Sequence, residues 1–290
     1  MIDLHMHSTC SDGQDKPEKL MEIAAAAGIK TLSLTDHDTI NGLERASKAA
    51  KRLGLDFITG IEISSQGGHE LHILGYGIDY NNKGLINFYE ENRVYRIERR
   101  NRFIELLNKK GIPITAEYIS LINDGKSTGR PHIARALVSM GYADSIDDAF
   151  EKYLQTPEFY SCERPKPNYQ TSIEMINNAG GIAVLAHPYT LKLDNDKFKE
   201  LLKDLISAGL CGIECYYSRH TPEQTAYYRR IADEYDLIFT CGSDYHGPDV
   251  KPDILLGRGC RDSLIKANIP ENEIIENLNN ALHNCSNNKM

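Results

Sequence analysis

The amino-acid sequence predicts an α/β protein, a distorted TIM-like (β/α)7 barrel with a helical insertion. Short apolar runs rich in β-branched residues recur along the chain, and helical patterns separate most of them. Such runs suit a barrel better than a β-sandwich, and an open doubly wound sheet is the alternative. The expected strands lie near residues 2–4, 31–34, 57–63, 71–76, 182–185, 212–216 and 237–241.

Two of the expected helices have clear end signals. A first helix over residues 17–27 has Pro17 in its first turn and Gly28 at the position where a left-handed residue commonly ends a helix. Further along, the segment 221–224 reads Thr-Pro-Glu-Gln, which resembles a capping box with proline at the first helical position. A second helix is therefore expected to begin there.

The stretch from about residue 81 to residue 164 breaks the alternation of strands and helices. It contains a long charged helix near residues 85–110 and two further helical patterns near 131–140 and 145–154, without a convincing strand. We therefore expect residues 1–80 and 165–290 to form the barrel. Residues 81–164 are expected to form a helical insertion that caps the substrate site.

Five arginines lie along the long helix of this insertion. Glutamates are interleaved with them and can form ordinary i,i+3 or i,i+4 ion pairs. We interpret the run as a solvated helix face, and contact with RNA or phosphate is the alternative. The arginines are Arg93, Arg96, Arg99, Arg100 and Arg102.

Composition indicates a soluble globular protein. Hydrophobic residues make up 41% of the 290 residues, and no apolar tract reaches the roughly 20 residues of a membrane-spanning helix. The formal net charge of −8 disfavours non-specific coating of nucleic acid but leaves small anionic substrates open. The N-terminus lacks the pattern of an export signal, so we expect a cytoplasmic protein, and no protein partner is evident. The seven scattered cysteines form no Cys-x-x-Cys, which argues against disulfides or a thiolate zinc site.

Histidines and carboxylates at the ends of the apolar runs carry the functional signal. His5 and His7 lie two residues apart, and side chains at i and i+2 of a strand face the same side, so both imidazoles can converge on one ion. Asp244 and His246 repeat this spacing after the last run. Glu62 lies inside an apolar strand, where an unpaired carboxylate would cost several kcal/mol, so we expect a cationic partner there.

Nine such residues lie at or just beyond apolar runs, and the carboxyl ends of barrel strands assemble a common site. Nine ligands exceed what one ion can use. Imidazole nitrogens and carboxylate oxygens without thiolate suit two or three manganese, iron or zinc ions rather than calcium or magnesium alone. Ions about 3.5–4 Å apart can deprotonate a shared water and stabilise a phosphoryl group, so we predict phosphoester hydrolysis. The nine residues are His5, His7, Asp12, His37, Glu62, His72, His187, Asp244 and His246.

The motifs that contain these residues resemble those of the polymerase and histidinol phosphatase (PHP) superfamily. The resemblance implies a distorted seven-stranded barrel with the nine residues as ligands, in which Glu62 bridges ions and a hydroxide shared by them attacks phosphorus. Manganese is the favoured ion, with iron or zinc as alternatives. The motifs are Asp3-Leu-His-Met-His-Ser8, Ser11-Asp-Gly13, Thr35-Asp-His37, Gly60-Ile-Glu62, Leu71-His72, Ala186-His-Pro188 and Gly242-Ser-Asp-Tyr-His-Gly247.

Within that superfamily the chain is similar to the bacterial nucleoside 3′,5′-bisphosphate phosphatases. The similarity lies in the helical insertion, in Gly129-Arg-Pro-His132 and in Ser218-Arg-His220. It implies removal of the 3′-phosphate from nucleotides such as pAp, giving AMP. For some relatives it also implies trimming of short RNA in the 5′-to-3′ direction.

Two basic segments are the expected substrate contacts. Arg130, His132 and Arg135 lie at a helix start, where anions are favoured and an arginine can hold phosphate with two hydrogen bonds. His132 could also protonate a leaving oxygen. Ser218, Arg219 and His220 follow the 212–216 strand, and we assign them to a substrate phosphate. Asp36, beside His37, either orients a ligand or accepts a proton.

Two other functions are compatible with the sequence. Histidinol-phosphate phosphatase uses the same scaffold, but two separate basic segments favour a substrate with two phosphates. A PHP module without catalytic activity could serve as a metal-stabilised interaction domain. Such a module would be free to lose ligands, and none of the nine expected positions is substituted here.

Overall fold

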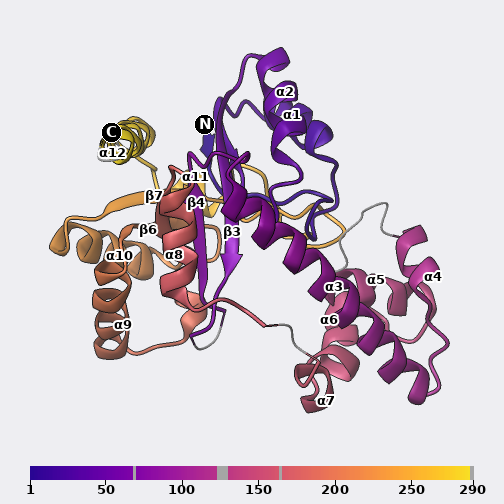
Figure 1. Ribbon diagram of the computed structural model, residues 1–290. Coiled ribbons are helices and arrows are strands. Elements are labelled where there is room, and N and C mark those ends of the chain that lie inside the picture. Colours follow the sequence, from indigo (N-terminus) through magenta and orange to yellow (C-terminus); the bar gives the residue numbers. More distant parts are fainter. Residues whose placement is uncertain (68–69, 123–129, 163–164, 288–290) are drawn as a thin grey trace.

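The computed structural model describes residues 1–290 except 68–69, 123–129, 163–164 and 288–290 (Figure 1). Seven strands form one sheet in the order β1 to β7, and each corresponds to a predicted strand. This confirms the predicted α/β barrel with seven strands. The strands are β1 Ile2–Asp3, β2 Thr31–Leu34, β3 Asp56–Ser64, β4 His72–Tyr76, β5 Ile182–Leu185, β6 Leu210–Tyr217 and β7 Ile238–Gly242.

One strand runs against the others. Strand β4 pairs antiparallel with both β3 and β5, whereas the remaining neighbours in the sheet pair in parallel. The start of β4 therefore lies at the same edge of the sheet as the ends of its neighbours. A histidine that opens β4 can meet residues that follow the other strands.

The sheet is nearly closed into a barrel through the segments that extend β1 and β7. The backbone N–H of Leu4 donates to the carbonyl of Cys241 at 3.1 Å, and that of His7 donates to the carbonyl of Tyr245 at 2.9 Å. In the opposite direction Asp244 donates to the carbonyl of His5 at 2.8 Å. These bonds bring the first and last pairs of predicted ligands side by side.

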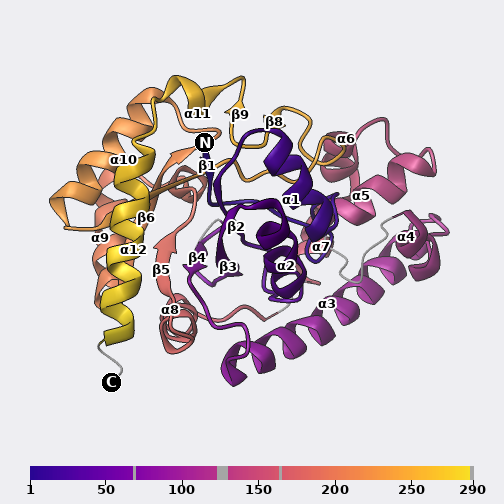
Figure 2. The same cartoon turned by 90° about the horizontal axis from the view of Figure 1, so that it is seen from above.

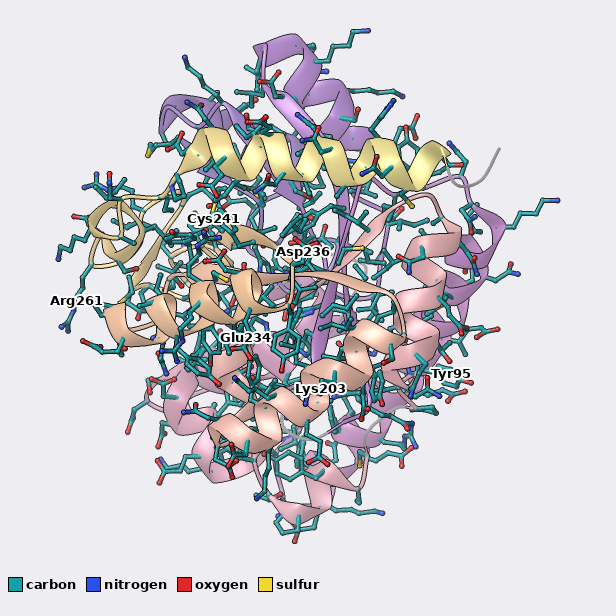
Figure 3. The ribbon with its side chains drawn as sticks, turned by 90° about the vertical axis from the view of Figure 1, so that its left-hand side faces the viewer. Tyr95, Lys203, Glu234, Asp236, Cys241 and Arg261 are labelled. Carbon is teal, nitrogen blue, oxygen red and sulfur yellow. The ribbon has the colours of Figure 1, made fainter. Side chains whose placement is uncertain are left out.

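Helices surround the barrel on its outer side (Figure 2). The predicted capping box is present at the start of α10, where Thr221 accepts from the N–H of Gln224 and the Gln224 side chain accepts from the N–H of Thr221. The last helix, α12, packs across β7 and β5, next to α10 (Figure 3). These helices are α1 Pro17–Ala26, α2 Leu43–Leu53, α8 Tyr169–Asn178, α9 Asn195–Ser207, α10 Pro222–Glu234, α11 Ser263–Lys266 and α12 Glu271–Asn287.

A short 3₁₀ helix, Pro188–Leu191, follows β5, and a small hairpin of β8 (Ile254–Leu255) and β9 (Gly259–Cys260) follows β7. The sequence patterns did not predict the hairpin or the last two helices. No helix in the described part of the chain combines the length and the apolar character that crossing a membrane requires.

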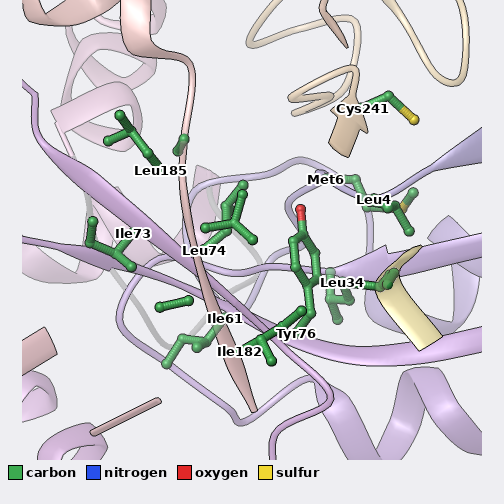
Figure 4. Close-up of a cluster of buried hydrophobic side chains, with 14 of the residues drawn as sticks. Leu4, Met6, Leu34, Ile61, Ile73, Leu74, Tyr76, Ile182, Leu185 and Cys241 are labelled. Atoms are coloured by element: carbon green, nitrogen blue, oxygen red, sulfur yellow. The ribbon is translucent and has the colours of Figure 1, made fainter. Parts of the chain in front are cut away.

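Buried apolar side chains of the strands and the segments that extend them pack on both faces of the sheet. Figure 4 labels ten of these buried residues: Leu4, Met6, Leu34, Ile61, Ile73, Leu74, Tyr76, Ile182, Leu185 and Cys241. Leu74 shares the inner face with Glu62, its partner on β3, whereas Ile61 lies with Ile176 of α8 against Gly75 on the outer face.

Between β4 and α8, the described residues form helices that are joined by turns and loops. The long first helix, α3 (Lys83–Lys109), leads away from the barrel to the shorter ones (Figures 1 and 2). These helices enclose their own apolar cluster, in which the rings of Phe103 and Phe159 lie 4.7 Å apart. The shorter helices are α4 Ala116–Ile122, α5 Arg130–Ser139, α6 Ile146–Ala149, the π-helix Phe150–Leu154 and α7 Pro157–Tyr160.

Candidate metal centre

The nine side chains singled out in the sequence meet at one mouth of the barrel. His5, His7 and Asp12 follow β1, and His37 follows β2. Glu62 belongs to β3 and His72 opens the antiparallel β4. The remaining three residues follow β5 and β7. Local strand geometry and the reversed direction of β4 together produce this convergence.

Four overlapping groups of possible ligands account for all nine residues among those the structure describes. In each group the ligand atoms lie within 4.8 Å of one another. The groups are His7, Asp12, His37 and His246; His5, His7 and Asp244; His5, Glu62 and His187; and His37, Glu62 and His72. Because His5, His7, His37 and Glu62 each belong to two groups, neighbouring ions would share ligands.

Glu62 lies at the centre of these groups. Its side chain is fully buried, and five imidazoles surround it. Burial raises the pKa of Glu62, but His37, His5 and His72 outweigh that effect and hold the pKa well below its usual range. Oε2 lies 3.2 Å from His5 Nε2, 3.2 Å from His7 Nε2 and 3.0 Å from His37 Nδ1; Oε1 lies 2.8 Å from His72 Nδ1 and 2.9 Å from His187 Nε2.

Several polar atoms of the cluster lack the hydrogen-bond partners that burial requires. Asp12 Oδ1 and His37 Nδ1 are buried without a hydrogen bond. The Nε2 atoms of His5 and His7 lie 3.2 Å apart, which requires a proton or a cation between them. Buried polar atoms are normally satisfied, and these donors are imidazole and carboxylate groups. The residues therefore fit a cluster of divalent cations.

In the protein without bound cations, burial and nearby charges set the pKa values of the imidazoles. Burial lowers the pKa of His5, but Glu214, Glu62 and Asp244 raise it well above its ordinary value. The pKa of His7 is raised to about 9, because hydrogen bonds to Asp244 and Glu62 outweigh burial. His246 differs, since burial and the nearby Lys251 lower its pKa to about 4.

Asp36 fixes the loop that carries the first ligands. Its Oδ1 accepts from Ser8 N–H at 2.7 Å and from the Ser11 hydroxyl at 2.6 Å, and its Oδ2 accepts from the Ser8 hydroxyl at 2.6 Å. Asp36 is buried and does not line the cavity described below. These bonds favour the orienting role for Asp36 over the proton-accepting role that the sequence left open.

Two buried carboxylates of the site were missed by the sequence patterns. Glu214, on β6, accepts from His5 Nδ1 at 2.9 Å and from the N–H of His187 at 2.8 Å. Asp3 accepts from the N–H of Ser243 at 2.9 Å and from its hydroxyl at 2.5 Å. Glu214 had the same signal as Glu62, a glutamate after Gly-Ile in an apolar strand.

The backbone around two of the nine residues is strained. His187 has φ 25° and Asp244 has φ 56°, both in the region that disfavours residues other than glycine. Close packing next to Asp244 needs Gly242, because a Cβ there would lie 2.2 Å from His5 Cβ and 2.7 Å from Glu214 Oε1. Such strain persists only where the surroundings hold the residue in place, and here it aims both side chains into the site.

A cavity of about 1110 Å³ opens above the nine residues. Several of them line it, together with Tyr189, Tyr217 and part of the insertion, including Phe150. Besides Asp12 and Asp244, four further carboxylates lie on its wall: those of Glu70, Asp147, Glu151 and Asp253. Six basic residues also line it: Arg96, Arg99, Arg130, Lys166, Arg219 and Lys251.

The predicted substrate residues fall into two sets. Arg130 and Arg219 line the cavity, and Arg219 pairs with Asp253 at 2.9 Å. The side chains of His132, Arg135, Ser218 and His220 are not among those that line it. His220 is buried and bonds through Nδ1 to the carbonyl of Cys215 at 2.9 Å.

His132 belongs to α5 of the insertion and does not line the cavity. It is almost completely buried in α5. Burial and Arg135 lower its pKa to about 4, so its imidazole is neutral at neutral pH in the protein without substrate. Gly129, which precedes this helix in the motif, lies outside the described residues.

The interpretation of the arginine run on α3 as a solvated face is wrong for Arg96 and Arg99, because both line the cavity. Arg96 Nη2 donates to the carbonyl of His37 at 2.9 Å and to Asp38 Oδ2 at 2.8 Å. Arg93 is an exposed i,i+3 partner of Glu90, as expected. The interleaved glutamates indicated ion pairs along the helix but not which part of the long helix lies against the barrel.

Comparison with known proteins gives a consistent assignment. A family model described as the PHP domain matches residues 3–247. Over 247 residues the chain is 36% identical to a 5′-3′ exoribonuclease of Haemophilus influenzae, with 85% of this chain and 90% of that protein covered. It is 33% identical over 263 residues to a 3′,5′-nucleoside bisphosphate phosphatase of Chromobacterium violaceum, with 90% of each covered.

A solved structure shows the same likeness. An amidohydrolase from Chromobacterium violaceum, determined with bound sulfate and without metal, matches with a TM-score of 0.79 at 34% identity. The match covers 86% of this chain and 89% of that one. The similarity therefore extends over the barrel and most of the insertion.

Proposed function

The chain belongs to the PHP domain family of phosphoesterases, and we propose that it removes the 3′-phosphate from nucleoside 3′,5′-bisphosphates such as pAp. Family membership confirms the resemblance seen in the motifs. The proposal about the substrate is supported by the relative from Chromobacterium violaceum, which is named for that activity.

The distribution of charge around the cavity is the observation that carries the proposal. Arg96, Arg99 and Arg130 reach the cavity from the insertion, whereas Arg219 reaches it from the barrel. The candidate metal ligands lie in the same cavity. A substrate with two separated phosphates can place one at the ligand cluster and the other against arginines, which hold phosphate through paired hydrogen bonds.

The nine residues would hold two or three divalent cations, of which manganese is favoured and iron or zinc are alternatives. When bound, such cations supply an activated water and neutralise charge on the phosphoryl oxygens. Glu62 would contribute one oxygen to each side of the cluster. Asp36, Glu214 and Asp3 hold the ligand-bearing segments in place through the hydrogen bonds described above.

The insertion, residues 81–164, would act as the substrate cap. Arg96 ties α3 to the segment that carries His37, and Ile146 and Phe150 add an apolar portion to the cavity wall. An apolar surface beside arginines suits a nucleoside with phosphates on it. His132 and Arg135 do not line the cavity, so they would support the helix that carries Arg130 rather than contact the substrate.

Short RNA is a second candidate substrate. The specific observation that favours it is the 36% identity with a relative named as a 5′-3′ exoribonuclease. The same cluster would hydrolyse a phosphodiester in that case, with the terminal phosphate held by the basic residues.

Phosphate release by the manganese-loaded protein from pAp and from histidinol phosphate, together with release of mononucleotides from a short 5′-phosphorylated RNA, tests the proposal. We expect release from pAp with a higher kcat/KM than from histidinol phosphate. A higher kcat/KM for histidinol phosphate than for pAp would contradict the proposal and indicate a histidinol-phosphate phosphatase. Absence of release from every substrate by protein that retains its ions would support an interaction module without catalysis.

A further inference from the structure

The two carboxylate oxygens of Asp244 face different surroundings. Oδ1 points to the ligand cluster, 3.3 Å from His7 Nε2 and 3.7 Å from His5 Nε2. Oδ2 points away and accepts two hydrogen bonds, from the Tyr217 hydroxyl at 2.7 Å and from Lys251 Nζ at 2.6 Å. The carboxylate is therefore divided between an inner oxygen and an outer oxygen that already has two donors.

Lys251 is held beside Asp244 by the loop that follows β7. Its N–H donates to the carbonyl of Gly247 at 2.9 Å, which closes a turn. Gly247 has φ 97°, and a Cβ there would lie 2.4 Å from Gln14 Cβ, so this turn needs glycine. The loop is also attached to the segment after β1, because Asp249 N–H donates to Gln14 Oε1 at 2.9 Å.

Tyr217 holds Asp244 from the other side. It ends β6 and is buried, and its ring packs edge-on against His187 with centroids 5.5 Å apart. The hydroxyl at the end of β6 and the ammonium from the loop after β7 thus donate to the same oxygen. Lys251 lies beyond residue 247, where the match to the PHP family model ends.

We propose that Lys251, with Tyr217, is a positioning residue that occupies the outer oxygen of Asp244, so that only Oδ1 is presented to a cation held with His5 and His7. The inference rests on the proposed metal-dependent function. Residues that hydrogen-bond a metal ligand fix its orientation, and their removal commonly weakens metal binding or activity by about 10–100-fold.

Positioning and simple charge predict opposite effects of removing Lys251. If Lys251 acts by orienting the carboxylate, a variant without the ammonium binds manganese more weakly, since binding must then order Asp244. If its charge merely repels the cations, the same variant binds manganese more tightly. The sign of the change in affinity distinguishes these two roles.

The test compares Lys251→Met with Lys251→Arg, starting from metal-free protein. Lys197→Met is the matched control, because Lys197 forms an exposed pair with Asp194 at 3.5 Å on α9. Manganese binding is measured by calorimetric titration, and phosphate release from pAp is measured against manganese concentration. Circular dichroism checks the fold of each variant.

We expect Lys251→Met to raise the manganese concentration for half-saturation of one site by about tenfold or more. At saturating manganese its KM for pAp should stay near that of the wild type, while Lys251→Arg should recover most of the affinity. Tyr217→Phe removes the other donor and should also weaken manganese binding. This variant provides the test if Lys251→Met does not fold.

Unchanged or tighter manganese binding by Lys251→Met, or a raised KM with unchanged manganese dependence, would overturn the inference. These outcomes are distinct from failure of the proposed function. In that event the wild-type protein itself would bind no manganese or release no phosphate from pAp.

Discussion

Glu62 and Glu214 show how the same local sequence serves two purposes. Both follow Gly-Ile in an apolar strand, and both are fully buried. Glu62 offers its oxygens to five imidazoles, whereas Glu214 holds one imidazole and one backbone N–H in place. The position of each strand in the barrel, rather than its sequence, separates a candidate ligand from a supporting residue.

Replacing Glu62 by glutamine tests its central position. The amide has nearly the same volume but no charge, so the fold should survive while manganese binding weakens and phosphate release falls by at least about 100-fold. Titration calorimetry, phosphate release and circular dichroism measure these three properties. Wild-type manganese affinity and activity in Glu62→Gln would contradict a role for Glu62 in holding ions.

The raised pKa values of His5 and His7 predict that manganese binding releases protons. With a pKa of about 9, His7 is protonated at neutral pH in the metal-free protein, and a cation must displace that proton. Apparent affinity should therefore rise with pH until about 9 and fall toward acid. Calorimetry in two buffers of different ionisation enthalpy counts the protons, and equal heats in both buffers would contradict the prediction.

The nine candidate ligands could be found from the sequence because each lies at or beyond an apolar run. Asp3 and Glu214 also lie in apolar runs, but this pattern does not distinguish a supporting carboxylate from a ligand, and Lys251 lies beyond the last run. Their roles depend on partners far along the chain, such as Ser243 for Asp3 and the N–H of His187 for Glu214. Such pairings follow only once the strand order and register are known.

At the scale of elements, the direction of β4 could not be predicted. A period-two pattern gives the faces of a strand but not its direction relative to its neighbours. The strand positions were predicted because apolar runs mark them, and α10 was predicted from its capping box. The hairpin of β8 and β9 is short and has no such pattern.

The attachment of α3 to the barrel gives a prediction for this element. Arg96 and Asp38 form an ion pair whose side chains are 11% and 0% exposed. Breaking a buried pair by removing one partner costs about 3–5 kcal/mol, so Arg96→Met should lower the free energy of unfolding by roughly that amount. It should also raise KM for pAp, because the cap is less firmly held over the ligand cluster.

Arg93→Met is the matched control for that experiment. Arg93 lies on the same helix but pairs with Glu90 on the surface, where an ion pair contributes only about 0–1 kcal/mol. Chemical denaturation and steady-state kinetics of both variants provide the comparison. Equal stability of the two variants would show that Arg96 does not anchor the helix.

At the scale of the whole molecule, a chain with a net charge of −8 places six basic residues around one cavity. The net charge of the chain is therefore a poor guide to the charge of the substrate. Small anions remain compatible with an acidic protein because the local field in a cleft depends on its lining residues. The basic lining was predictable only for Arg130 and Arg219, which belong to the recognised motifs.

The central claim is that imidazoles and carboxylates from distant parts of the chain together hold a cluster of divalent cations. The most direct measurement is elemental analysis of manganese-loaded protein after dialysis, made in parallel on the wild type and on Glu62→Gln. The claim predicts two or three equivalents of manganese in the wild type and fewer in the variant. Less than one equivalent in the wild type, or equal amounts in both, would contradict it.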